Sequence, residues 1–176
     1  SCLSPFCYPC AKSSLERVLI NGTLFSVIVG VLVMGSLWYN PRLWLQDYPK
    51  VVQAKVPPMS PHEKLQQRFI AIPFLLLMLG VPFVSVLMVK AANGGSITFP
   101  FAYLTAVGVL QLFNLFDALV LDYLILTVMQ PSFAIIPGTT CEESLVVGWA
   151  FQVRNFVKGV VITALLSLPI AFLASL

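Results

Sequence analysis

Charged side chains are scarce in this chain of 176 residues, because Lys, Arg, Asp and Glu together make up 10% of it while apolar residues make up 59%. An ordinary soluble domain has about 25% charged residues, which cover its surface. The mean hydropathy of +0.92 points in the same direction. This composition excludes soluble globular, disordered and coiled-coil proteins and predicts a multi-pass membrane protein.

The chain has very little histidine and no familiar catalytic motif. Each of these facts excludes a class of cofactor site or of enzyme. His62 is the single histidine, so bis-histidine haem ligation within the chain is excluded and a His/Cys zinc site has few ligands. The sequence has no glycine-rich phosphate loop, no G-x-S-x-G and no H-E-x-x-H motif. It has no basic stripe with interleaved aromatic residues, so we expect no nucleic-acid partner. The cofactor stays unknown, with bound lipid or pigment left open.

Four runs without Lys, Arg, Asp or Glu contain 24, 21, 26 and 18 residues, and a bilayer crossing needs about 20 apolar helical residues. We predict an all-α integral membrane protein, a bundle of four transmembrane helices with two longer loops on one side. Residues 1–17 are expected to form a Cys- and Pro-containing tail, and residues 18–176 a single transmembrane domain. The predicted helices are 18–38, 69–89, 99–125 and 157–176, and the loops are 39–68 and 130–156.

Local signals place two boundaries. Ser60 is a good N-cap, Pro61 suits the first helical position and Glu63 completes a capping box, so a helix should begin at Pro61 and run into the second span. The Asn-Gly-Gly sequence at 93–95 predicts a tight reversal between the second and third spans.

The third apolar run is longer than a bilayer requires, because it continues to Met129. A helix from Phe99 to Met129 would be roughly 45 Å long, against a hydrocarbon core of roughly 30 Å. We therefore expect this helix to tilt, protrude or break.

Basic residues are distributed unevenly, since seven of the ten Lys and Arg lie in or beside the two long loops. By the positive-inside rule, both long loops should face the cytoplasm, or the stroma or matrix of an organelle, with both termini on the opposite side. The chain begins with Ser1 and not with Met, so we expect a segment to precede it. The seven residues are Arg42, Lys50, Lys55, Lys64, Arg68, Arg154 and Lys158, and the other three are Lys12, Arg17 and Lys90.

Four polar residues on the third predicted helix form the strongest candidate site: Gln111, Asn114, Asp117 and Asp122. On an α-helical wheel they fall at about 0°, 300°, 240° and 20°, which is one broad face. A charged carboxylate at the centre of a bilayer costs at least about 2.5–3.5 kcal/mol, so it normally faces a partner or water. This face is therefore a candidate intramembrane polar site.

Two interpretations of this face remain open. In the functional one, Asp117 and Asp122 bind a proton, a cation or a ligand, and Asn114 and Gln111 orient them. In the structural one, the acids lie among lipid headgroups and Asn114 links neighbouring helices. No span contains an interior cation to pair with the acids. The expected ionic partners are Arg42, Arg68, Arg154 and Lys158.

The cysteines suggest redox chemistry only weakly. Cys2, Cys7 and Cys10, with Cys141 far downstream, match the spacing of a plant-type iron–sulfur protein. Three predicted spans separate Cys10 from Cys141 and put them on opposite faces, which argues against a single-chain cluster. Cys7 and Cys10 also form a C-x-x-C pair, a spacing that lowers thiol pKa in redox proteins. A structural disulfide, a metal shared with a partner chain and lipidation are the alternatives.

Three functions are compatible with these observations. The missing catalytic motifs and the small size favour a non-catalytic membrane protein, an accessory or assembly subunit whose partners are the lipid bilayer and other membrane protein subunits. The second is a small transporter or proton-coupled membrane protein that uses Asp117 and Asp122. The third is a membrane thiol-disulfide oxidoreductase that uses Cys7 and Cys10.

Overall fold

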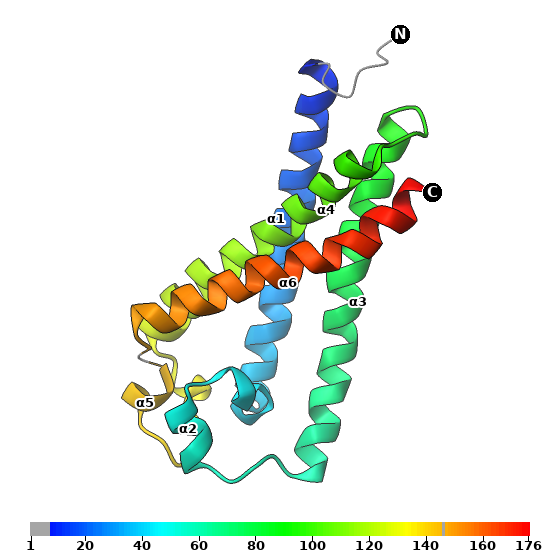
Figure 1. Cartoon of the computed structure of the whole chain (residues 1–176). Coiled ribbons are helices and arrows are strands. Elements are labelled where there is room, and N and C mark those ends of the chain that lie inside the picture. Colours follow the sequence, from blue (N-terminus) through cyan, green and yellow to red (C-terminus); the bar gives the residue numbers. More distant parts are fainter. Residues whose placement is uncertain (1–7, 146) are drawn as a thin grey trace. The chain divides into compact units, whose positions relative to one another are not determined.

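The computed structural model describes residues 8–145 and 147–176, with side chains from residue 14 onward. Every regular element within these residues is a helix (Figure 1), so the prediction of an all-α fold is confirmed. The long elements are α1 (Tyr8–Tyr39), α3 (Pro61–Ala92), α4 (Phe99–Phe116), η2 (Asp117–Met129) and α6 (Trp149–Ser175). The short ones are η1 (Pro41–Asp47), α2 (Lys50–Lys55), η3 (Ser132–Ala134) and α5 (Cys141–Leu145).

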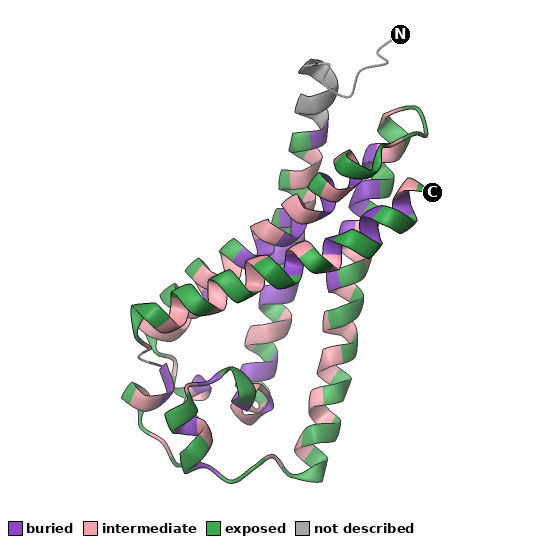
Figure 2. Ribbon diagram, viewed as in Figure 1, coloured by how far each residue is buried: buried purple, intermediate pink, exposed green. Residues whose placement is uncertain are grey.

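Four helical stretches are long and apolar enough to cross a membrane, in agreement with the number expected from the sequence. Exposed residues, many of them apolar, occur along all four stretches (Figure 2). The stretches are Ser14–Tyr39, Pro61–Ala92, Phe99–Met129 and Cys141–Ser175.

The boundaries expected from local signals are confirmed. At the start of α3, the backbone N–H of Glu63 donates to Ser60 Oγ at 3.2 Å and the backbone N–H of Ser60 donates to Glu63 Oε2 at 2.7 Å. These two bonds are a complete capping box. After α3, Gly94 and Gly95 have φ angles of +74° and +86°. Glycine adopts this left-handed region without steric cost, which makes the reversal possible.

The long third apolar run does not continue as an α-helix to its end. The chain is α-helical to Phe116 and a π-helix from Asp117 to Met129. In a π-helix each carbonyl accepts from the residue five positions later, and the helix is wider and shorter per residue than an α-helix. The helical stretch thus continues from Phe99 to Met129, and its hydrogen-bond pattern changes at Asp117.

The chain forms two compact units. Among the described residues, the first contains 8–27, 76–115 and 157–176, and the second contains 28–75, 116–145 and 147–156.

Close backbone approach holds α1 against α4 in the first unit. A Cβ atom at Gly22 would lie 2.5 Å from Leu112 Cδ1, and one at Gly108 would lie 2.9 Å from Val18 Cγ1. Small residues at such crossings let apolar side chains of the facing helix pack against backbone, which is how helices associate in lipid. The two glycines therefore specify this helix pair from both sides.

Polar contacts connect the other helices of the first unit. Asn21 Nδ2 of α1 donates to Ser85 Oγ of α3 at 3.1 Å. Lys90 Nζ, in the last turn of α3, donates to the carbonyl oxygen of Ala174 at 3.0 Å. A cation at the C-terminal end of a helix is favourable because the last carbonyls there lack intrahelical partners.

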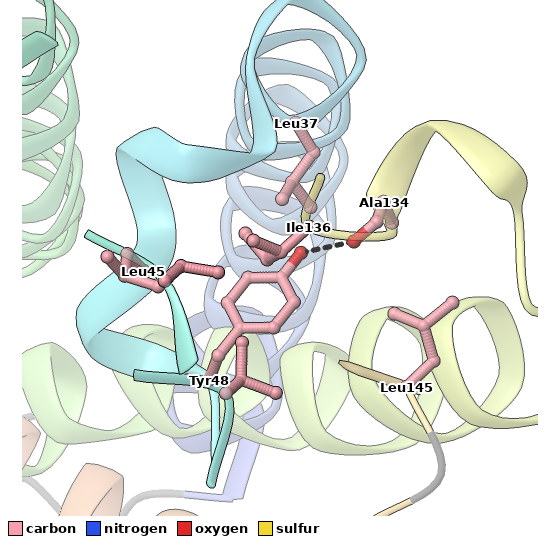
Figure 3. Close-up of a cluster of buried hydrophobic side chains, with 8 residues drawn as sticks. Leu37, Leu45, Tyr48, Ala134, Ile136 and Leu145 are labelled. Atoms are coloured by element: carbon pink, nitrogen blue, oxygen red, sulfur yellow. Dashed lines mark hydrogen bonds between the residues drawn. The ribbon is translucent and has the colours of Figure 1, made fainter. Parts of the chain in front are cut away.

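The second unit contains a folded loop module, which we define as residues 40–60 and 130–145. Tyr48 lies at its centre, and its hydroxyl donates to the carbonyl oxygen of Ala134 at 2.6 Å (Figure 3). The two long segments predicted as loops are thus joined by an apolar core, to which α1 contributes Leu37. The other buried residues of that core are Leu45, Tyr48, Val52, Val56, Ala134, Ile136 and Leu145.

Ion pairs at the edges of the loop module add to this packing. Arg42 Nε donates to Glu63 Oε1 at 2.6 Å, and Arg42 Nη2 donates to the carbonyl oxygen of Pro57 at 3.0 Å. Lys55 forms a salt bridge with Glu143, which connects α2 to α5. The module is therefore fastened to the start of α3 as well as internally.

Candidate functional site

Gln111 and Asn114 lie in α4 and form an amide network with α6. Gln111 Nε2 donates to Thr163 Oγ1 at 2.8 Å and to the carbonyl oxygen of Val160 at 3.3 Å. Asn114 Nδ2 donates to Gln111 Oε1 at 3.3 Å, and Asn114 is buried. We call Gln111, Asn114 and Thr163 the amide network. It satisfies polar groups within an apolar helix pair and connects the two helices, which is the chemistry of the structural interpretation.

Asp117 and Asp122 lie in the second unit, on the π-helix η2, and both are half-buried. A third acid, Asp47, lies close enough to interact electrostatically with both of them. Asp117 interacts in the same way with Asp122. We call Asp47, Asp117 and Asp122 the aspartate cluster. Asp47 itself is exposed, so the cluster extends from a solvent-accessible carboxylate to two partly buried ones.

Asp47 owes its position to the folding of η1. Asn40 caps this short helix, since its Oδ1 accepts from the backbone N–H of Arg42 at 3.0 Å, and Pro41 follows at the position where proline is favoured. Asp47 ends the helix, and the next residue, Tyr48, is anchored in the core of the loop module by its bond to Ala134. A tight cap at one end and a buried anchor at the other thus position the carboxylate.

Sequence reasoning did not identify Asp47 as a site residue. The residue lies in a long loop far along the chain from Asp117, and no spacing rule connects them. Its place directly before a tyrosine that becomes buried was the one available signal, and the burial of Tyr48 could be known only from the fold.

Two of the four basic residues expected to neutralise the acids contact other groups. Arg42 binds Glu63, and the guanidinium of Arg154 lies 5.4 Å from the ring centroid of Phe151, a cation–π distance.

Carboxylates are also common ligands of metal ions. In the part of the chain that the structure describes, no three His, Cys, Asp or Glu side chains are placed to hold a metal ion. The cluster therefore brings carboxylates within range of one another's charge without forming a coordination shell.

The cysteine candidates lie mostly outside the described residues. This holds for Cys2 and Cys7, and for the side chain of Cys10, so the redox and iron–sulfur interpretations of the tail stay predictions. Cys141, at the start of α5, is a half-buried free thiol whose Sγ donates to Gln130 Oε1 at 3.4 Å.

No protein-family model, curated protein sequence or solved structure matches this chain. Among the candidate site residues, those of the aspartate cluster have the most specific chemistry, because they gather like charges that an apolar chain would otherwise avoid.

Proposed function

We propose that this chain is a small proton-coupled membrane protein and that the aspartate cluster carries the protons. The observation that supports this most directly is the place of Asp47, which brings a solvent-accessible carboxylate within charge range of both Asp117 and Asp122. An exposed acid next to half-buried ones is the arrangement that a proton needs to pass from water into an apolar helix.

The electrostatics of three neighbouring carboxylates support protons as the cargo. Like charges that share a poorly solvated site do not all ionise together, and such groups exchange protons as a coupled set. Acidic side chains on apolar helices of membrane proteins commonly act as proton relays. A proton also needs no coordination shell, so the cluster suits it better than a chelated metal ion.

Proton flux through reconstituted protein tests the proposal. Purified protein is placed in liposomes that contain a pH-sensitive dye, and a potassium gradient with valinomycin drives proton entry. The double variant Asp117→Asn/Asp122→Asn should abolish flux, and Asp47→Asn should slow it.

The matched control is Glu142→Gln, which neutralises an exposed acid on α5 outside the cluster. Its flux should equal that of the unmodified protein. Flux that survives in the double aspartate variant, or that Glu142→Gln lowers equally, would overturn the proposal.

A second function is supported by the loop module. Two long segments fold over a shared apolar core, as expected of an accessory or assembly subunit that docks on other membrane proteins. Extraction from native membranes in mild detergent should then yield a larger assembly of constant composition. A lone monomer with proton flux of its own would exclude this alternative.

We also propose how the chain is oriented in the membrane. We place both long loops on the cytoplasmic, stromal or matrix side and both termini on the other, because the basic residues gather in and beside the loops. A protease-cleavable tag inserted at Gly138, an exposed turn with φ of +93°, should resist protease added outside. The same tag at Gly94 should be cut. The reverse result would invert the topology.

A further inference from the structure

The π-helix η2 is an unusual element, and both half-buried acids of the aspartate cluster lie on it. It extends from Asp117 to Met129, and the N–H of Gln130 donates to the carbonyl oxygen of Ile125, five residues earlier, at 3.1 Å. Most π-helical segments are single turns inserted in α-helices, frequently at functional sites. Thirteen consecutive residues in this form require a specific cause.

The five-residue spacing of Asp117 and Asp122 places them on the same side of a π-helix. A π-helix turns by roughly 80° per residue, so residues five apart lie roughly 40° from each other around the axis. An α-helix turns by about 100° per residue, and the same two residues would lie about 140° apart. The π form therefore brings the two carboxylates onto one side, and an α form would separate them.

Side chains in the second half of η2 hold this hydrogen-bond register. The hydroxyl of Thr127 donates to the carbonyl oxygen of Asp122, five residues earlier, at 2.9 Å. Gln152 of α6 donates from Nε2 to Thr127 Oγ1 at 3.0 Å, and Gln130 Nε2 donates to the carbonyl oxygen of Thr127 at 3.0 Å. Thr127 is thus held by two glutamines while it binds the backbone of Asp122.

We propose that Thr127 and Gln152 are positioning residues that lock η2 in the π form and so assemble the Asp117–Asp122 pair. This inference rests on the proposed proton-carrying function, since it assigns the residues that keep that site together. Without the lock, η2 relaxes to the α form, Asp122 rotates away from Asp117, and the cluster is lost while the rest of the chain stays folded.

Cross-linking of two cysteines by a short bifunctional thiol reagent such as dibromobimane measures the register directly. Cα atoms five residues apart are separated by roughly 6 Å in a π-helix and by about 8.5 Å in an α-helix. A direct disulfide would need Cβ atoms about 3.5–4.5 Å apart, which side chains that diverge from a helix do not reach, whereas the short reagent bridges the closer pair and not the more distant one. Leu119 and Leu124 on η2 are both exposed leucines with this spacing, and replacing them leaves every acid in place.

The chain also offers a matched control. Leu19 and Leu24 are exposed leucines with the same spacing on the α-helix α1. Both pairs are introduced as cysteines into a variant in which the four native cysteines are serine. After timed treatment with the reagent and mass spectrometry of the whole protein, Leu119→Cys/Leu124→Cys should be cross-linked several-fold faster than Leu19→Cys/Leu24→Cys.

The lock is tested in the same cysteine variant. Thr127→Val, which keeps the shape and removes the hydroxyl, should lower cross-linking at 119/124 toward the level of the control pair. Thr127→Ser should restore it, and Gln152→Ala should give an intermediate loss. Equal cross-linking rates for the two cysteine pairs would show that η2 is α-helical and would overturn the inference. A Thr127→Val variant with undiminished cross-linking would remove Thr127 as the lock.

The outcome is independent of proton flux. If the cross-linking results are as expected but the aspartate variants keep their flux, the proposed function alone fails. If flux depends on the aspartates but the two cysteine pairs react alike, the positioning role alone fails.

Discussion

Asn114 of α4 lies directly against the backbone of Gly159 on α6. A Cβ atom at Gly159 would lie 1.8 Å from Asn114 Oδ1 and 2.8 Å from its Cγ. No side chain fits between them, so the absence of a Cβ atom at residue 159 is what allows the two helices and the amide network to meet.

Gly159→Ala should therefore destabilise the protein by about 1–3 kcal/mol, the usual cost of inserting a methyl group into packed structure. Denaturant unfolding in detergent, followed by circular dichroism, measures the change. Gly80→Ala is the control, because no atom lies within 4 Å of a Cβ at that position of α3. A helical glycine with free space should tolerate alanine or gain up to about 1 kcal/mol from it. Equal effects of the two substitutions would contradict the close approach.

The hydrogen bond from Gln111 to Thr163 predicts measurable coupling between α4 and α6. Hydrogen bonds between helices within a membrane average about 0.6 kcal/mol and reach about 1.7 kcal/mol. Gln111→Leu and Thr163→Val should each destabilise the protein, and the double variant should lose less than the sum of the two by an amount in that range. A double-mutant cycle in the same unfolding assay gives the coupling. Strict additivity would show that the two side chains act independently.

Tyr48 predicts a loss of stability in alkaline solution. Burial, with a further contribution from the charge of Asp47, raises the pKa of its hydroxyl above the usual value of about 10. The folded state thus holds this proton more tightly than the unfolded state. The stabilisation is complete below about pH 10 and falls as the pH rises further, by at most about 1.4 kcal/mol per pH unit.

Tyr48→Phe isolates this effect. It removes the bond to Ala134 and should cost about 1 kcal/mol at neutral pH, while its stability should decline less steeply above pH 10. Thermal melting at a series of pH values compares the two proteins. Parallel alkaline profiles would mean that Tyr48 does not contribute to the pH dependence.

The Arg42–Glu63 ion pair should contribute to the stability of the loop module, and salt should weaken that contribution only in part. Both side chains are mostly shielded, with 15% and 17% of their surface exposed, so salt screens the pair less than a fully exposed one. Arg42→Ala and Glu63→Gln should each cost about 1 kcal/mol, and the effects should not add. Gln at residue 63 keeps the capping box, so Glu63→Gln reports the ion pair alone. Melting temperatures at low and high salt test this, and a double variant with fully additive losses would contradict it.

The hydrophobic pattern was sufficient to predict the number and type of the long helices. A bilayer crossing needs an uninterrupted apolar stretch, and the charge-free runs locate such stretches without reference to the rest of the chain. The start of α3 at Pro61 and the reversal at Gly94 were predictable for the same reason, since a capping box and a left-handed turn depend only on neighbouring residues.

The candidate site was predictable only in part. Gln111, Asn114, Asp117 and Asp122 stand out because polar groups are costly in an apolar helix. Their placement on one face assumed α-helical geometry throughout, whereas the chain becomes a π-helix at Asp117. Gln111 and Asn114 bind α6, and the two acids lie near Asp47.

The features that escaped prediction all depend on contacts between distant segments. The core of the loop module joins residues near Tyr48 to residues near Ala134, and the register of η2 is held by a bond from Gln152 to Thr127. Local sequence decides where a helix begins and whether it is apolar, because the free energies of capping and of transfer into an apolar environment depend on residues within one segment. Which hydrogen-bond register it adopts, and which carboxylate comes near it, is decided by partners that only folding brings together.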